Sequence, residues 1–169
     1  MTKGKVNGQK GKAALLLIIL SLLFLYSADA QDIIDYEKPS SVSWRLAEAT
    51  YLPNSNIEMR IVLYGAKKKD IYYHAKCAAI KILLFDGIGT GGYAKPLLSD
   101  GEHTVFQSYP SYIQNLYRKR YNDFIMNCTM ESEFKKADAE KGTSFNVVVK
   151  ASLLRRDLEK NGLKNKIGI

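Results

Sequence analysis

The stretch that decides the fold of this chain is residues 70–85, DIYYHAKCAAIKILLF. Asp70 suits the N-cap of a helix, and Gly87 suits its C-terminal stop. At about 100° per residue, the apolar side chains cover most of the helix surface. They leave a polar stripe of Asp70, His74 and Lys81. A helix that is apolar nearly all round is buried or lies at an interface, so we expect it at the centre of the core.

Alternating apolar residues predict two pairs of strands on either side of this helix. Residues 42–52, of which 46–49 also suit a helix, and residues 57–64 are separated by the turn cluster Pro53-Asn54-Ser55-Asn56. Residues 128–134 and 145–151 alternate likewise, and the charged segment 135–142 lies between them. This second pair predicts an antiparallel hairpin with a solvated tip.

Two further helices are expected. Pro110 suits the first turn of a helix that runs to about Ile125, and Ser152 can cap a short helix that Gly162 stops. The tail 163–169 is basic and open to a short last strand. The order ββα–loop–α–ββα predicts an α+β fold: one domain, a mainly antiparallel sheet, and two to three helices on one face.

The first thirty residues have the three parts of a secretory signal. An apolar run over residues 13–25, broken by Ser21, is followed by Ala28-Asp29-Ala30, and four lysines precede it: Lys3, Lys5, Lys10 and Lys12. The run is shorter than the roughly 20 residues that span a bilayer. We therefore predict a signal peptide over 1–30, an extended lead-in over 31–41 and one domain over 42–169.

This signal predicts an exported protein that is periplasmic, associated with the cell envelope or secreted, with no transmembrane segment after cleavage. The segment holds four lysines and one aspartate, so its removal lowers the net charge from +8 to +5. That charge allows weak attraction to an anionic polymer or lipid surface. Nucleic acid is a poor candidate because the basic residues are scattered.

The two cysteines, Cys77 and Cys128, leave two interpretations open. An oxidising compartment permits a disulfide between them. They also suit two separate buried thiols, which behave as small apolar side chains.

The glycine-rich stretch 87–101 does not match a nucleotide-binding loop. A phosphate-binding loop needs a Lys directly after its last Gly, whereas Lys95 comes later and Pro96 follows it. Glycines 87, 89 and 92 have the dinucleotide spacing, but the stretch follows a predicted helix instead of a strand. We expect no cofactor here, and a plain linker or a mobile loop that orders on a partner.

We expect no catalytic or metal site. The chain has two histidines, His74 and His103, without metal-ligand spacing. His74 and Cys77 lie one turn apart on the central helix, a spacing that arises easily by chance.

Tyrosines and basic residues alternate on the predicted helix 110–125. Arg120 falls within the apolar face of this helix, and three interpretations stay open. Its aliphatic part is buried along the tyrosines while the guanidinium reaches water, or it pairs with a buried carboxylate such as Asp86, or it anchors an anionic ligand. Tyr and Arg are enriched at interaction sites. Our candidate partner-binding residues are Gly89, Gly91, Gly92, Tyr93, Lys95, Tyr112, Arg118, Lys119 and Arg120.

Two segments carry a resemblance. Residues 78–88, AAIKILLFDGI, and residues 145–150, FNVVVK, which run into 153–163, LLRRDLEKNGL, resemble small exported α/β domains of bacterial envelope machinery. Examples are the N-terminal domain of the flagellar-assembly protein T and lipoproteins of outer-membrane secretion complexes. The resemblance implies a non-enzymatic assembly or accessory role, although this chain lacks a lipid-bearing cysteine after its apolar run.

Three functions follow as hypotheses. The first is an exported, non-enzymatic envelope protein that binds a protein partner through the glycine-rich loop and the Tyr/Arg helix. The second is a binding module for an anionic envelope polymer or lipid head group. The third is an enzyme whose site is assembled from separated segments.

Overall fold

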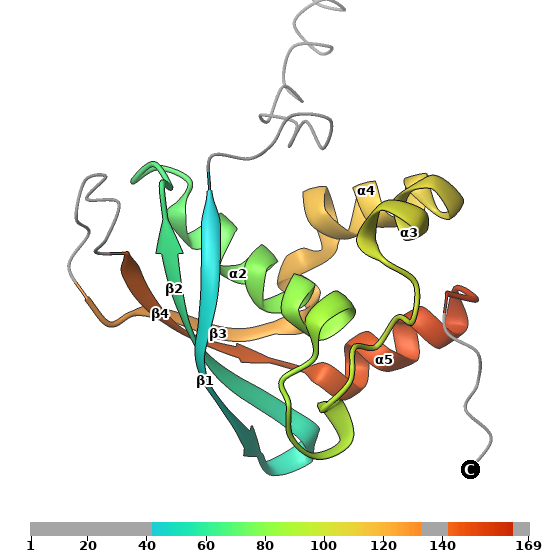
Figure 1. The fold of residues 1–169 in the computed structure, drawn as a ribbon, viewed down its shortest axis with the longest axis horizontal. Helices are drawn as coiled ribbons and strands as arrows, with labels where there is room; N and C mark the ends of the chain where they lie inside the picture. Colours follow the sequence, from blue (N-terminus) through green and yellow to red (C-terminus); the bar gives the residue numbers. More distant parts are fainter. Residues whose placement is uncertain (1–41, 133–141, 164–169) are drawn as a thin grey trace, which may run out of the picture. The chain divides into compact units, whose positions relative to one another are not determined.

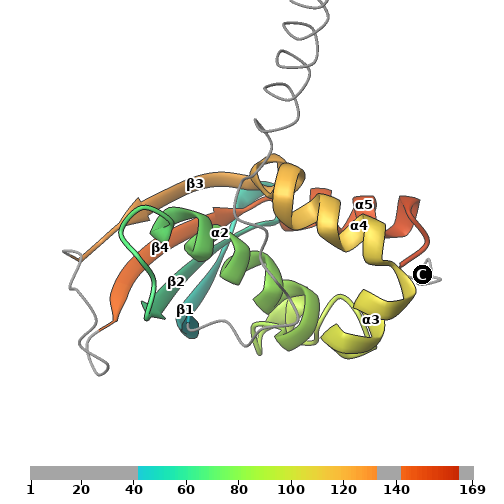
Figure 2. The same ribbon diagram turned by 90° about the horizontal axis from the view of Figure 1, so that it is seen from above.

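The computed structural model describes residues 42–132 and 142–163, which form an α+β domain. The predicted signal peptide, the lead-in, most of the 135–142 tip and the tail after Leu163 lie outside the described residues. Figures 1 and 2 show the strands on one side of the domain and α3, α4 and α5 on the other, with α2 between them.

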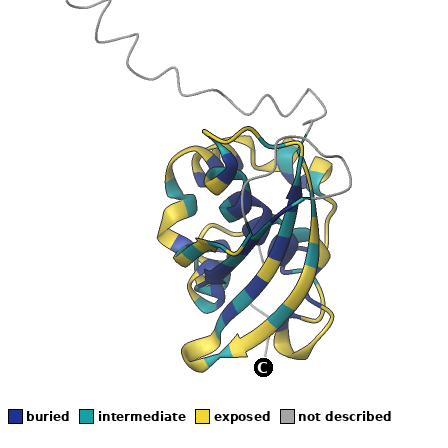
Figure 3. Cartoon of the chain, turned by 90° about the vertical axis from the view of Figure 1, so that its left-hand side faces the viewer, coloured by how far each residue is buried: buried dark blue, intermediate teal, exposed yellow. Residues whose placement is uncertain are grey.

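Four antiparallel strands form one sheet in the order β1-β2-β4-β3. Strands β1 (Ser43–Leu52) and β2 (Asn56–Tyr64) form the first predicted hairpin, and β3 (Ile125–Met130) and β4 (Thr143–Val149) form the second. Apolar side chains alternate along the two central strands, so one face of the sheet is buried (Figure 3). The buried residues of that face are Ile57, Met59, Ile61, Leu63, Phe145, Val147 and Val149.

The central helix is where the sequence predicts it. Helix α2 (Ile71–Lys81) continues as one π-helical turn over Ile82–Asp86 and ends at Gly87. Ala75, Ala79 and Ile80 are fully buried, which confirms that this helix belongs to the core. Asp70 occupies the N-cap position, but its side chain makes no capping hydrogen bond.

Strand β3 begins three residues earlier than predicted. A bulge between Ile125 and Asn127 puts Met126 out of register, so alternation does not reveal the first half of the strand. The preceding helix accordingly ends at Phe124. It is built from α4 (Pro110–Asn115), a π-helical turn over Leu116–Arg120 and a 3₁₀ turn over Tyr121–Phe124.

Two helical details differ from the prediction. Lys150, and not Ser152, takes the N-cap position of helix α5 (Ala151–Lys160), so this helix starts two residues earlier than predicted. Helix α3 (Glu102–Ser108) was not predicted. It is short and buries a single residue, Val105, so it leaves little periodicity to detect.

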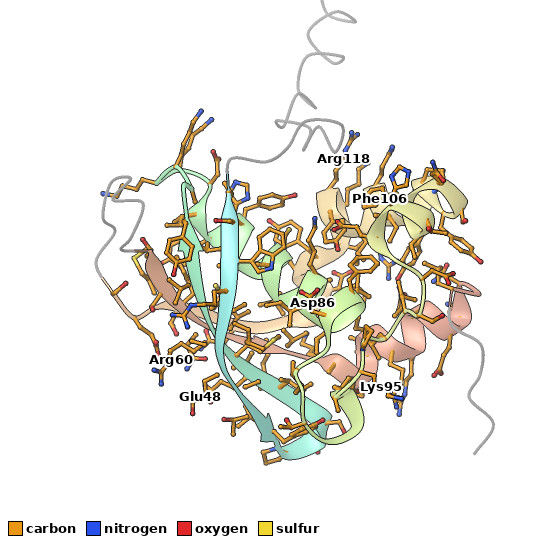
Figure 4. All side chains as sticks on the ribbon, viewed as in Figure 1. Glu48, Arg60, Asp86, Lys95, Phe106 and Arg118 are labelled. Carbon is orange, nitrogen blue, oxygen red and sulfur yellow. The ribbon has the colours of Figure 1, made fainter. Side chains whose placement is uncertain are left out.

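The opposite face of the sheet is polar. Arg60 on β2 contacts Glu48 on β1 at 2.8 Å and Glu131 beyond β3 at 3.5 Å (Figure 4). These side chains are well exposed, so the pairs add little to stability.

Candidate functional site

The glycine-rich stretch 87–101 folds back onto the end of α2. The amides of Leu97 and Leu98 donate to the carbonyls of Leu83 and Leu84 at 2.9 and 3.0 Å. Four of its apolar side chains are buried: Ile88, Tyr93, Leu97 and Leu98. This stretch is therefore an integral part of the domain core, and it differs from both the linker and the mobile loop that the glycines suggested.

Two side chains from distant elements hold the glycine-rich part of the stretch. The Tyr51 hydroxyl on β1 donates to the carbonyl of Thr90 at 2.8 Å and accepts from the amide of Tyr93 at 2.9 Å. On α5, Arg155 donates to the carbonyl of Gly92 at 3.3 Å, and its guanidinium lies 4.9 Å from the centre of the Tyr93 ring. Tyr51 thus holds the segment from β1, and Arg155 holds it from α5.

The glycines of this segment have different roles. Gly91 has φ +57°, and a Cβ there would lie 2.5 Å from the Tyr51 hydroxyl, so its backbone requires glycine. A Cβ on Gly92 would meet nothing within 4 Å, and its φ is not positive. Gly89, Gly91, Gly92 and Lys95 are exposed, whereas Tyr93 is only 6% exposed. Tyr93 is therefore a core residue that supports this surface.

Arg120 forms an ion pair, with a carboxylate different from the one suggested. Its Nη2 lies 2.6 Å from Oδ1 of Asp157 on α5, and its Nε lies 3.6 Å from Oδ2 of Asp123. The Tyr112 hydroxyl donates to the other Asp157 oxygen at 2.7 Å. The Asp157 side chain is 15% exposed. Tyr112, Arg120 and Asp157 therefore join α4 to α5.

The π-helical turn explains why Arg120 appeared on the apolar face. Each π-helical turn holds one residue more than an α-helical turn, which shifts the residues after it around the helix axis. Over Leu116–Arg120 this shift keeps Leu116 and Tyr117 buried and leaves Arg120 at the edge, facing Asp157. A projection that assumes regular α-helical geometry therefore puts Arg120 on the apolar face, where it does not lie.

Asp86 belongs to a different charged group, at the end of α2. Lys81 and Glu102 form an ion pair of 2.5 Å, and the Lys81 ammonium lies 5.3 Å from the centre of the Trp44 ring. Burial and the neighbouring Glu102 raise the pKa of Asp86, while Lys81 lowers it. This group ties α2 to α3.

Arg118 and Lys119 lie on the surface at another part of the domain. Both are exposed on the π-helical turn after α4. Figure 4 shows Arg118 at the upper edge of the domain and Lys95 at its lower edge. The candidate residues thus divide into two separate surfaces, with Tyr93, Tyr112 and Arg120 engaged in contacts within the fold.

The cysteines are free thiols in the structure. Burial raises the pKa of Cys77 to about 12 and that of Cys128 to about 11. Burial also lowers the pKa of His74, with the nearby Asp70 opposing that shift. A thiol with so high a pKa stays protonated at neutral pH, which opposes a nucleophilic role for Cys77 beside His74.

Among residues 42–132 and 142–163, no group of three His, Cys, Asp or Glu side chains could hold a metal ion. No helix within the described ranges is long and apolar enough to cross a membrane. Comparison of the chain with protein-family models, curated proteins and solved structures finds no match.

Proposed function

We propose that this chain is an exported, non-enzymatic protein with an assembly or accessory role in the cell envelope. It binds a protein partner through one surface, which we call the loop face. The loop face consists of Tyr51, Gly89, Gly91, Gly92 and Lys95. The signal-like first thirty residues support the export, and the resemblance of residues 78–88 and 145–163 to envelope domains supports the accessory role.

The observation that carries the proposal is that this glycine-rich surface is ordered before any partner arrives. The Tyr51 hydroxyl makes two hydrogen bonds to the segment, and Arg155 makes one from the other side. A surface that is already fixed loses little conformational entropy on binding, which favours affinity.

The aromatic content of the loop face agrees with this role. Tyr51 is 40% exposed although it is held by hydrogen bonds at its hydroxyl. A rigid, half-exposed tyrosine offers a large contact area at low entropic cost, as in many recognition sites. Lys95, which is exposed two residues after Tyr93, supplies a positive charge.

The test is site-specific photocrosslinking in exporting cells. A photoreactive side chain replaces Gly92 or Lys95 on the loop face, and Lys119 in the control protein. Gly92 tolerates a side chain, since a Cβ there meets nothing within 4 Å. We expect one dominant protein adduct from the loop-face positions, and its loss when Gly92→Trp is added to the Lys95 probe. Equal adduct patterns from all three positions would refute the loop face as the binding surface.

A further inference from the structure

A second exposed surface, distinct from the loop face, lies at the end of the domain where β1 begins. We call it the entry face, and it consists of Lys67, Lys68, Tyr72, Arg118 and Lys119. In Figure 1 the start of β1, the turn between β2 and α2, and the end of α4 all lie along the upper edge of the domain.

The pairing of the strands places the basic turn at this end. Ser43, the first residue of β1, pairs with Tyr64, the last residue of β2. The turn that follows Tyr64 carries Lys67 and Lys68, both exposed, before α2 begins at Ile71. Lys69 and Asp70 follow Lys68 in the sequence, and Nζ of Lys69 lies 3.8 Å from Oδ2 of Asp70.

Contacts of α2 bring Arg118 and Lys119 to the same end. The Tyr73 hydroxyl, in the first turn of α2, donates to the carbonyl of Tyr117 at 3.2 Å. The rings of Tyr73 and Tyr121 meet edge to face at 5.1 Å. These contacts hold the π-helical turn, which carries the exposed Arg118 and Lys119, beside the first turns of α2.

An exposed aromatic side chain lies between the two basic groups in the sequence. Tyr72 is 46% exposed, and its ring meets Phe145 of β4 edge to face at 5.3 Å. Tyrosine is enriched at the head-group level of membranes, where its ring and its hydroxyl meet different surroundings. Basic residues with an exposed tyrosine suit an interface of this kind.

We propose that the entry face binds the anionic head groups of a phospholipid leaflet. The four basic side chains are attracted to the negative surface, and Tyr72 inserts at the level of the head groups. Each exposed Lys or Arg near such a surface strengthens binding about fivefold. The attraction weakens with salt because the charges are exposed.

The test measures cosedimentation of the protein with vesicles. The protein is purified from exporting cells, and its N-terminus is recorded by mass spectrometry. It is mixed with vesicles of phosphatidylglycerol and phosphatidylcholine, or of phosphatidylcholine alone, at low and high salt. Two double variants remove charge from the entry face: Lys67→Gln with Lys68→Gln, and Arg118→Gln with Lys119→Gln. The matched control, Arg156→Gln with Lys160→Gln, removes the same charge from two exposed residues of α5.

We expect each entry-face pair to weaken binding to the anionic vesicles about 25-fold at low salt, at about fivefold for each charge. We expect the control pair to bind as the unaltered protein does, and high salt to remove the difference. An equal loss in the control pair would overturn the proposal, because net charge would then explain the binding. Binding that does not depend on phosphatidylglycerol would overturn it as well. Thermal unfolding of each variant confirms that it is folded.

Discussion

Replacing Asp157 by alanine should destabilise the domain strongly, because this one carboxylate holds two side chains of the α4 segment. It accepts from Arg120 at 2.6 Å and from the Tyr112 hydroxyl at 2.7 Å, and its side chain is 15% exposed. The substitution leaves a half-buried hydroxyl and a guanidinium without their acceptor. Asp123, 3.6 Å from Arg120, compensates in part.

The size of the effect follows from these contacts. Leaving a buried partner unsatisfied costs about 1–3 kcal/mol. The Arg120 side chain is 30% exposed, so water replaces part of its lost interaction. We therefore expect Asp157→Ala to lower the free energy of unfolding by about 3 kcal/mol. For a domain of this size that corresponds to a drop in Tm of about 12 °C.

The assay is urea unfolding of Asp157→Ala, Arg120→Met and the double variant. The double variant should lose less than the sum of the two single losses, by about 1–3 kcal/mol, because both partners belong to one network. Glu48→Ala is the control, since it breaks an exposed ion pair of 2.8 Å and should cost less than about 1 kcal/mol. A loss in Asp157→Ala no larger than in this control, or additive single losses, would refute the reasoning.

Three further predictions concern the loop, a thiol and a carboxyl group. Gly91→Ala should lower the Tm clearly, because its Cβ would lie 2.5 Å from the Tyr51 hydroxyl at a positive φ, whereas Gly92→Ala should leave the Tm within about 2 °C; equal shifts would contradict the assigned roles. Burial raises the pKa of Cys77 from 9.0 to about 12, so the stability present below pH 9 should fall as the pH rises toward 12, and Cys77→Ala should reduce that fall in denaturant titrations. The pKa of Asp86 is raised by burial and by Glu102, so the folded state disfavours the carboxylate; Asp86→Asn should therefore raise the Tm at neutral pH, and this gain should disappear as the pH falls through the pKa of Asp86. A gain that persists in acid would show that charge is not its cause.

Local patterns in the sequence were enough to place most of the elements. Apolar side chains around most of the helix surface predicted the central helix at residues 70–85. Alternation of apolar and polar residues predicted the two hairpins and so the α+β class. Such patterns work because a buried face repeats with the period of its own element. They failed where the period itself changes, at the Met126 bulge and in the π-helical turn that carries Arg120.

The candidate surfaces depended more on tertiary contacts. Glycine content singled out residues 87–101, but the buried Ile88, Tyr93, Leu97 and Leu98 were the signal that this stretch packs against the core. Tyr51 was not singled out as a contact of the loop, because nothing near it in the sequence refers to a segment 39 residues later. Asp157 was missed as the partner of Arg120 for the same reason, at a separation of 37 residues.

The sequence by itself determined most of the helices and strands, the core-facing residues of α2 and of the central strands, and the signal-like character of the first thirty residues. The tertiary structure alone decided that Tyr51 and Arg155 hold the glycine segment, that Asp157 pairs with Arg120, and that two basic segments far apart in the chain share one end of the domain. The reason is physical: periodicity records how a residue sits within its own element, whereas a contact between elements depends on how they pack together. That packing follows from the burial of apolar surface summed over the whole chain.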